Sequence, residues 1–137
     1  MTYKSVKEFL EKMKEQDAAV QAGIDFHKLA EKNKLPPEVF AAAPELAEFF
    51  GPGSRAEVPV AGMIDGRVQA RRIDRMALSA DAVKFIDFKT GGGDAADYRK
   101  QMAEYGRLLG EIYPGKKITG FIFWTGKSVL QQVFPVL

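Results

Sequence analysis

Residues 67–89 read RVQARRIDRMALSADAVKFIDFK. The parts of this stretch on either side of Ser79-Ala80-Asp81 are rich in apolar and β-branched residues, which is typical of β-strands. We therefore expect strands over 67–78 and 83–89. Because only a short polar turn connects them, the two strands are expected to be antiparallel neighbours.

A third strand precedes these two. Residues 57–64 read EVPVAGMI and are also strand-like. The dipeptide Asp65-Gly66 that follows is a strong signal for a type I′ hairpin turn. The three segments therefore predict a three-stranded antiparallel meander.

The chain after the meander predicts a helix and two further strands. Residues 95–113 have the apolar spacing of a helix, and Pro114-Gly115 stops it. Residues 118–124 read ITGFIFW, which suits a buried central strand, and 128–134 suit an edge strand. A strand, a crossover helix and a second buried strand predict that 83–89 and 118–124 lie parallel.

The N-terminal part is helical in pattern. Val6, Phe9, Leu10 and Met13 fall at helix spacing, and a second apolar stretch over 20–29 can continue the same helix. Pro36-Pro37 ends this pattern, and Pro37 is placed to begin a short helix that runs toward Phe49-Phe50. We expect one α/β domain over 1–137, with a helical part (1–50) and a core (51–137) made of a mixed sheet flanked by helices.

Composition excludes several kinds of site. The 137 residues are 46% hydrophobic and 28% charged, which is ordinary for a globular chain. The absence of cysteine excludes disulfides, thiol nucleophiles and cysteine-ligated metals, and a single histidine excludes a multi-histidine metal site. No apolar run approaches the length that spans a bilayer, and the charged N-terminal segment lacks the apolar core of a signal peptide. We expect a cytoplasmic protein without a membrane partner.

Positive charge is concentrated in the second part of the chain. The formal net charge is only +2, but all seven arginines follow residue 50. Arginine suits phosphate because its planar fork donates two hydrogen bonds at once. If nucleic acid is a partner, the later part of the chain is expected to contact it.

Two acids and a lysine form the strongest chemical signal. Asp87 and Lys89 are two residues apart on a strand, so their side chains share a face. A hairpin that turns near residue 80 places Asp74 opposite Asp87. Two facing carboxylates repel each other unless a cation lies between them, and Mg²⁺, or alternatively Mn²⁺, suits such oxygen ligands. Lys89 would then orient a metal-bound water or neutralise developing negative charge.

A structural alternative explains the same residues. Asp87 and Lys89 could form an exposed ion pair at a strand end, with Asp74 paired to Arg72 or Arg75. Against this alternative, both acids lie in strongly apolar strands, where an unpaired carboxylate would cost about several kcal/mol.

The predicted helix over 95–113 carries a second group of polar residues. Gln101 and Tyr105 are four residues apart and share a helical face that can reach the same pocket. The residues around them that could contact phosphate are Tyr98, Arg99, Lys100 and Arg107. Alternatively, Tyr105 is part of the core and the basic residues are solvated.

Six short segments together resemble one known family. In chain order they are GSRAEVPVAG (53–62), RIDR (72–75), IDFKT (86–90), YRKQMAEY (98–105), IYPG (112–115) and FWT (123–125). Within a span of roughly 45–133 they resemble the C-terminal nuclease domain of AddA/RecB-type helicase-nucleases, a branch of the PD-(D/E)XK superfamily.

The resemblance implies a restriction-endonuclease-like core and Mg²⁺-dependent hydrolysis of DNA phosphodiesters. It implies exonuclease-type DNA end processing, as in recombinational repair, with a helicase subunit or a parent helicase chain as partner. Asp74 and Asp87 would be metal ligands, Lys89 the catalytic lysine, and Gln101 and Tyr105 the family's Q-x-x-x-Y motif. The residues expected to bind nucleic acid are Arg72, Arg75, Arg99 and Lys100.

His27 and Glu57 are further site residues on which the sequence leaves alternatives open. Gly23-Ile-Asp-Phe-His27 resembles the family's G-x-x-x-H helix motif, whose histidine joins the metal site. The chain departs from the family in having a shorter span between His27 and Glu57, so His27 is either a third metal ligand or a packed helix residue. Glu57 either approaches the metal or lies on the surface. An alternative function follows, namely an inactive nuclease-fold module that binds DNA or a helicase.

Overall fold

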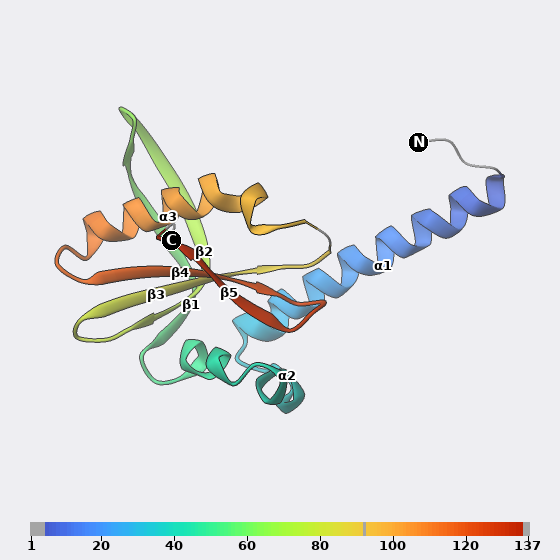
Figure 1. Ribbon diagram of the computed structural model, residues 1–137, viewed down its shortest axis with the longest axis horizontal. Coiled ribbons are helices and arrows are strands. Elements are labelled where there is room, and N and C mark those ends of the chain that lie inside the picture. The colour runs from blue at the N-terminus through green and yellow to red at the C-terminus, as the bar shows by residue number, and fades with distance from the viewer. Residues whose placement is uncertain (1–4, 92, 136–137) are drawn as a thin grey trace.

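The computed structural model describes residues 5–91 and 93–135. These residues form a five-stranded mixed sheet flanked by helices, with the strand order β1-β2-β3-β4-β5 (Figure 1). The strands are β1 (Ser54–Ile64), β2 (Arg67–Leu78), β3 (Ala82–Lys89), β4 (Lys117–Trp124) and β5 (Val129–Phe134). The first three are antiparallel, β3 and β4 are parallel, and β5 pairs antiparallel with β4. The predicted meander, parallel pair and edge strand are all confirmed.

The turn between β1 and β2 has the predicted geometry. Asp65 has φ 51° and Gly66 has φ 78°. Positive φ at both central residues is what a type I′ turn requires, and this turn matches the natural twist of a hairpin. The hairpin extends well beyond the rest of the sheet (Figure 1).

The helical segments differ from the predictions in two places. They are α1 (Val6–Glu31), α2 (Pro37–Ala42), the 3-10 helix η1 (Pro44–Phe50), the 3-10 helix η2 (Ala95–Tyr98) and α3 (Arg99–Ile112). The helix predicted from Pro37 toward Phe50 is divided, because Pro44 lacks an N–H and starts a separate helix. The helix predicted over 95–113 begins as a 3-10 turn capped by Asp94. Within the described residues, no helix is long and apolar enough to cross a membrane.

The sheet is covered on both faces. Helix α3 packs on one face, over Val83 and Phe85 of β3, while η1 and the C-terminal end of α1 pack on the other face, over Ile86 and Phe88 (Figure 1). Side chains of a strand alternate between the faces, so Asp87 lies on the same face as Phe85, toward α3. The N-terminal part of α1 projects away from the sheet (Figure 1).

Candidate functional site

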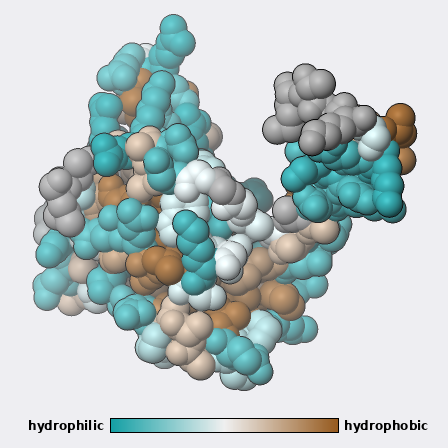
Figure 2. Space-filling model, turned by 45° about the vertical axis from the view of Figure 1, so that its right-hand side comes forward, coloured by the Kyte–Doolittle hydropathy of each residue, from teal (hydrophilic) through white to brown (hydrophobic). Residues whose placement is uncertain are grey.

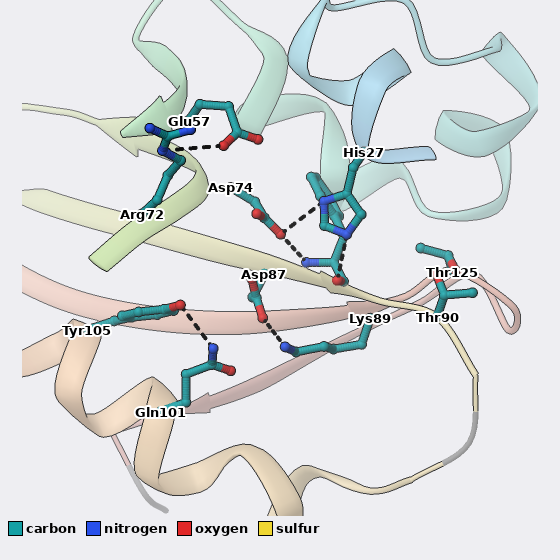
Figure 3. Close-up of polar contacts among 11 residues, drawn as sticks. His27, Glu57, Arg72, Asp74, Asp87, Lys89, Thr90, Gln101, Tyr105 and Thr125 are labelled. Atoms are coloured by element: carbon teal, nitrogen blue, oxygen red, sulfur yellow. Dashed lines mark hydrogen bonds and ion pairs between the residues drawn. The ribbon is translucent and has the colours of Figure 1, made fainter. Parts of the chain in front are cut away.

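Asp74 and Asp87 meet where β2 diverges from β3. The antiparallel register runs from Leu78 opposite Val83 to Arg75 opposite Ile86, and one further step places Asp74 opposite Asp87. Asp74 Oδ2 accepts a hydrogen bond of 2.8 Å from the backbone N–H of Phe88. The two carboxylates therefore lie at one position of the sheet, as the sequence predicts (Figure 3).

The surroundings of Asp74 disfavour its ionised form. Burial raises the pKa of Asp74 from 3.8 to about 8, and the negative charges of Asp87 and Glu57 contribute in the same direction. The N–H of Phe88 acts in the opposite direction because it stabilises the carboxylate. These effects therefore favour the protonated form of Asp74 at neutral pH.

Asp87 is buried and shares its face with Lys89. Asp87 is 6% exposed, and Lys89 Nζ lies 2.8 Å from Asp87 Oδ2. The contact is an ion pair without hydrogen-bond geometry, because this buried oxygen accepts no hydrogen bond from the described residues. The ammonium also lies over the ring of Tyr98, 4.4 Å from its centroid. The alternative of an exposed Asp87–Lys89 pair is therefore wrong.

His27 comes to the same place from the end of α1. Its Nε2 donates to the carbonyl oxygen of Phe88 at 3.1 Å, and its Nδ1 lies 3.6 Å from Asp74 Oδ2. The ring also packs edge-on against Phe88, with centroids 5.7 Å apart. The structure thus brings His27 to the acids, and its contacts suit both alternatives for this residue.

The residues present fit a divalent ion held by two carboxylates. Among residues 5–91 and 93–135, no three or more His, Cys, Asp and Glu side chains form a group that could hold a metal ion. Mg²⁺ does not need such a cage, because it is commonly held by one or two carboxylates, with waters and substrate phosphates completing its shell. Asp74 and Asp87 supply hard oxygen ligands at one place, and the pKa of Asp74, raised by its burial and by the charge of Asp87, is a shift that a bound cation would reverse.

Gln101 and Tyr105 of α3 lie beside the acids. Gln101 Nε2 donates to the phenol oxygen of Tyr105 at 3.0 Å, and Tyr105 is 5% exposed. Burial raises the pKa of Tyr105 to about 12, and the charges of Asp87 and Asp74 add to the shift. The phenol therefore stays protonated at neutral pH and lies within electrostatic reach of both carboxylates (Figure 3).

Three of the four residues predicted to bind nucleic acid are accessible. Arg99 and Lys100 are exposed at the start of α3, and the side chain of Arg72 is 70% exposed, with Nε 4.0 Å from Glu57 Oε2. Glu57 itself has φ 49°, an uncommon left-handed conformation for a residue other than glycine, and it is partly buried near Asp74.

Arg75 was wrongly predicted to bind nucleic acid. It is 5% exposed, and its guanidinium donates hydrogen bonds of 2.6 Å to the carbonyl oxygens of Phe49 and Ala30. These carbonyls belong to the last residues of η1 and to the last turn of α1, where helices lack internal donors. Arg75 therefore joins the two helices to β2 instead of facing a ligand.

The sequence did not reveal every polar contact of the site. The N–H and the carbonyl of Phe88 contact Asp74 and His27, respectively. Beyond the end of β3, the hydroxyls of Thr90 and Thr125 lie 2.8 Å apart. Backbone groups leave no signature in residue types, and the Thr90–Thr125 contact depends on the parallel pairing of β3 and β4; that predicted pairing was the only signal that could have found it.

A groove of about 470 Å³ lies beside the site, between α1 and the end of β3. One wall is the face of α1 that carries Ile24 and His27, and the other is the end of β3, with Phe88 and Lys89. Neither Asp74 nor Asp87 lines this groove.

Neither a scan against protein-family models nor a search of curated proteins finds a match to this chain. The function of the site therefore has to be inferred from its geometry.

Proposed function

We propose that this protein is a metal-dependent DNA nuclease built on a restriction-endonuclease-like core. One observation carries the proposal: the carboxylates of Asp74 and Asp87 converge from neighbouring strands, with the ammonium of Lys89 2.8 Å from Asp87. Two acids and a lysine on adjoining strands suit hydrolysis of a phosphodiester, because a divalent ion and an ammonium both stabilise charge on phosphate.

Asp74 and Asp87 would hold Mg²⁺, or Mn²⁺ in its place. When bound, the ion supplies a water of lowered pKa and neutralises charge on the scissile phosphate. Lys89 is placed to orient the attacking water or to stabilise the negative charge that develops on phosphorus-bound oxygens. The water oxygen would form a bond to phosphorus and release a proton to solvent, while the bond to the leaving sugar oxygen would break and that oxygen would take up a proton from solvent.

Positive side chains near the site would hold the DNA backbone. Arg72, Arg99 and Lys100 are exposed, so their charges are available to phosphates. By its resemblance, the chain would process DNA ends in recombinational repair, together with a helicase subunit or as part of a helicase chain.

Digestion of linear and of closed circular DNA in Mg²⁺, Mn²⁺ and chelator tests the proposal. We expect cleavage only with the metals, and a loss of at least about 100-fold in Asp87→Asn and in Lys89→Met. Asp81→Asn and Lys117→Met are matched controls, because both side chains are exposed and lie at the opposite end of β3 and at the start of β4. Activity that survives both site substitutions would exclude this mechanism.

A second candidate is a nuclease-fold module that binds DNA without cutting it. It is favoured by the absence, within the described residues, of a third side chain that completes a metal-binding group with the two aspartates. This candidate predicts DNA affinity that falls steeply with salt and no cleavage in any divalent ion. Cleavage by the wild-type protein would exclude it.

A further inference from the structure

The projecting helix α1 carries a single apolar seam. Val6, Leu10, Met13, Val20 and Ile24 are between 43% and 75% exposed. If position 17 is counted with them, these positions follow one another at alternating spacings of four and three residues. This spacing is the pattern of a two-stranded coiled coil. Figure 2 shows this helix set apart from the rest of the molecule, with hydrophobic atoms at its outer edge.

Such a seam is unusual on a helix that stands in water. From Val6 to Ile24 it extends about 27 Å along the helix axis, at 1.5 Å per residue. A long exposed line of large apolar side chains generally marks an interface, even though Asp17 interrupts this one. Because single helices gain most of their stability from packing of an apolar face, the seam also predicts that a partner stabilises α1.

The charges on α1 favour a second copy of the same helix in antiparallel orientation. Asp17 occupies the remaining seam position, and a parallel pair would place the two copies of Asp17 against each other. In an antiparallel pair, let the numbers of two facing residues, one from each copy, add up to 30. This register places Val6 beside Ile24 and Leu10 beside Val20. The same register places Met13 beside Asp17.

The border of the seam complements itself in this register. Lys14 follows Met13, so it comes next to Asp17 of the second copy, and Lys7 comes near Asp25 of the second copy. Two-fold symmetry forms each contact twice, which gives four pairs of opposite charge.

We propose that α1 forms an antiparallel two-helix interface with α1 of a second copy of this chain. The interface is isologous, so the same face of both copies is covered. Ile24 also lines the groove beside His27 and Lys89, so Val6 of the second copy would lie at the edge of that groove. The inference does not depend on the proposed nuclease activity.

Sedimentation equilibrium tests the interface. We expect a reversible dimer, and about a tenfold weaker one in Lys14→Glu, because this change makes two like-charge contacts. Lys12→Glu is the matched control, since Lys12 pairs with Glu15 of its own helix away from the seam, and it should leave the dissociation constant unchanged. Lys14→Glu combined with Asp17→Lys should restore association. A chain that is monomeric at all concentrations, or a double variant that is not restored, would overturn the proposal.

Cross-linking tests the orientation of the two helices. Because the chain has no cysteine of its own, links form only between introduced cysteines. Copies carrying Val6→Cys are mixed with copies carrying Ile24→Cys and treated with a short bismaleimide. The antiparallel register predicts links between the two kinds of copy. Links only between copies that both carry Val6→Cys would show parallel pairing and would refute the register.

Discussion

Replacing Asp74 by asparagine should stabilise the protein in a pH-dependent manner. The pKa of Asp74 rises from 3.8 in the unfolded chain to about 8 in the folded one. Below pH 4 both states are protonated at this residue. Between pH 4 and 8 only the folded state keeps the proton, so the free energy of unfolding falls as pH rises. Asparagine has no proton to lose and can still accept the 2.8 Å hydrogen bond from Phe88.

The size of the effect follows from the pH interval. From pH 5 to pH 8, a folded-state pKa of about 8 at Asp74 lowers the free energy of unfolding of the wild-type protein by about 4 kcal/mol. Because the two carboxylates can move apart and admit water when both ionise, we expect about 1–3 kcal/mol. The free energy of unfolding of Asp74→Asn relative to the wild-type protein should therefore be higher at pH 8 than at pH 5 by about 1–3 kcal/mol.

Urea unfolding in chelator at both pH values measures the gain. The single tryptophan, Trp124, is 5% exposed, so its fluorescence reports unfolding. Asp81→Asn is the control, because Asp81 is an exposed acid. The difference in stability between this variant and the wild-type protein should be the same at both pH values. At pH 8, added Mg²⁺ should stabilise the wild-type protein but not Asp74→Asn. If Asp74→Asn stabilises the protein by the same amount at pH 5 and pH 8, the pKa of Asp74 is not raised by its burial and by Asp87 as argued.

Three further predictions test the packing around the site. Arg75→Ala should lower the free energy of unfolding by about 2–4 kcal/mol, because it removes the buried guanidinium that donates to the carbonyls of Phe49 and Ala30, of which Ala30 keeps the N–H of Asn33 as a donor. Arg72→Ala should change the free energy of unfolding by less than about 0.5 kcal/mol in the same urea titration. Gly106→Ala should destabilise the protein by about 1–3 kcal/mol, since the added methyl group would overlap the ring of Phe134. Gly110→Ala on the same helix adds a methyl group that contacts nothing, so it should stabilise the protein by up to about 1 kcal/mol. Equal effects of the two substitutions would contradict this packing. In an ultraviolet pH titration, Tyr105→Phe should remove the component that ionises near pH 12, and loss of an earlier component instead would place Tyr105 in solvent.

The sheet could be predicted because its signals are local. Asp65-Gly66 determines a hairpin turn, and the apolar run 118–124 needs burial on both faces, which a central parallel strand provides. The symmetry of the second turn about residue 80 was enough to place Asp74 opposite Asp87.

Side-chain direction and helix packing were harder to predict. Arg75 follows Asp74 directly, so the alternation of side chains along a strand places it on the opposite face from Asp74. Nothing in the sequence shows that carbonyls of η1 and α1 lie on that face and accept its hydrogen bonds. The division of the second helical segment depends on Pro44, which lacks the N–H that a continuous helix would need there. The contacts of His27 required knowledge of how a helix far along the chain crosses the end of β3.

Binding of Mn²⁺, followed by electron paramagnetic resonance, tests the central claim most directly. If Asp74 and Asp87 converge on one divalent ion, the wild-type protein should bind one Mn²⁺ per chain at this site. Asp74→Asn and Asp87→Asn should each abolish that binding, and Asp81→Asn should retain it. Absence of binding, or binding that both site variants preserve, would contradict the account.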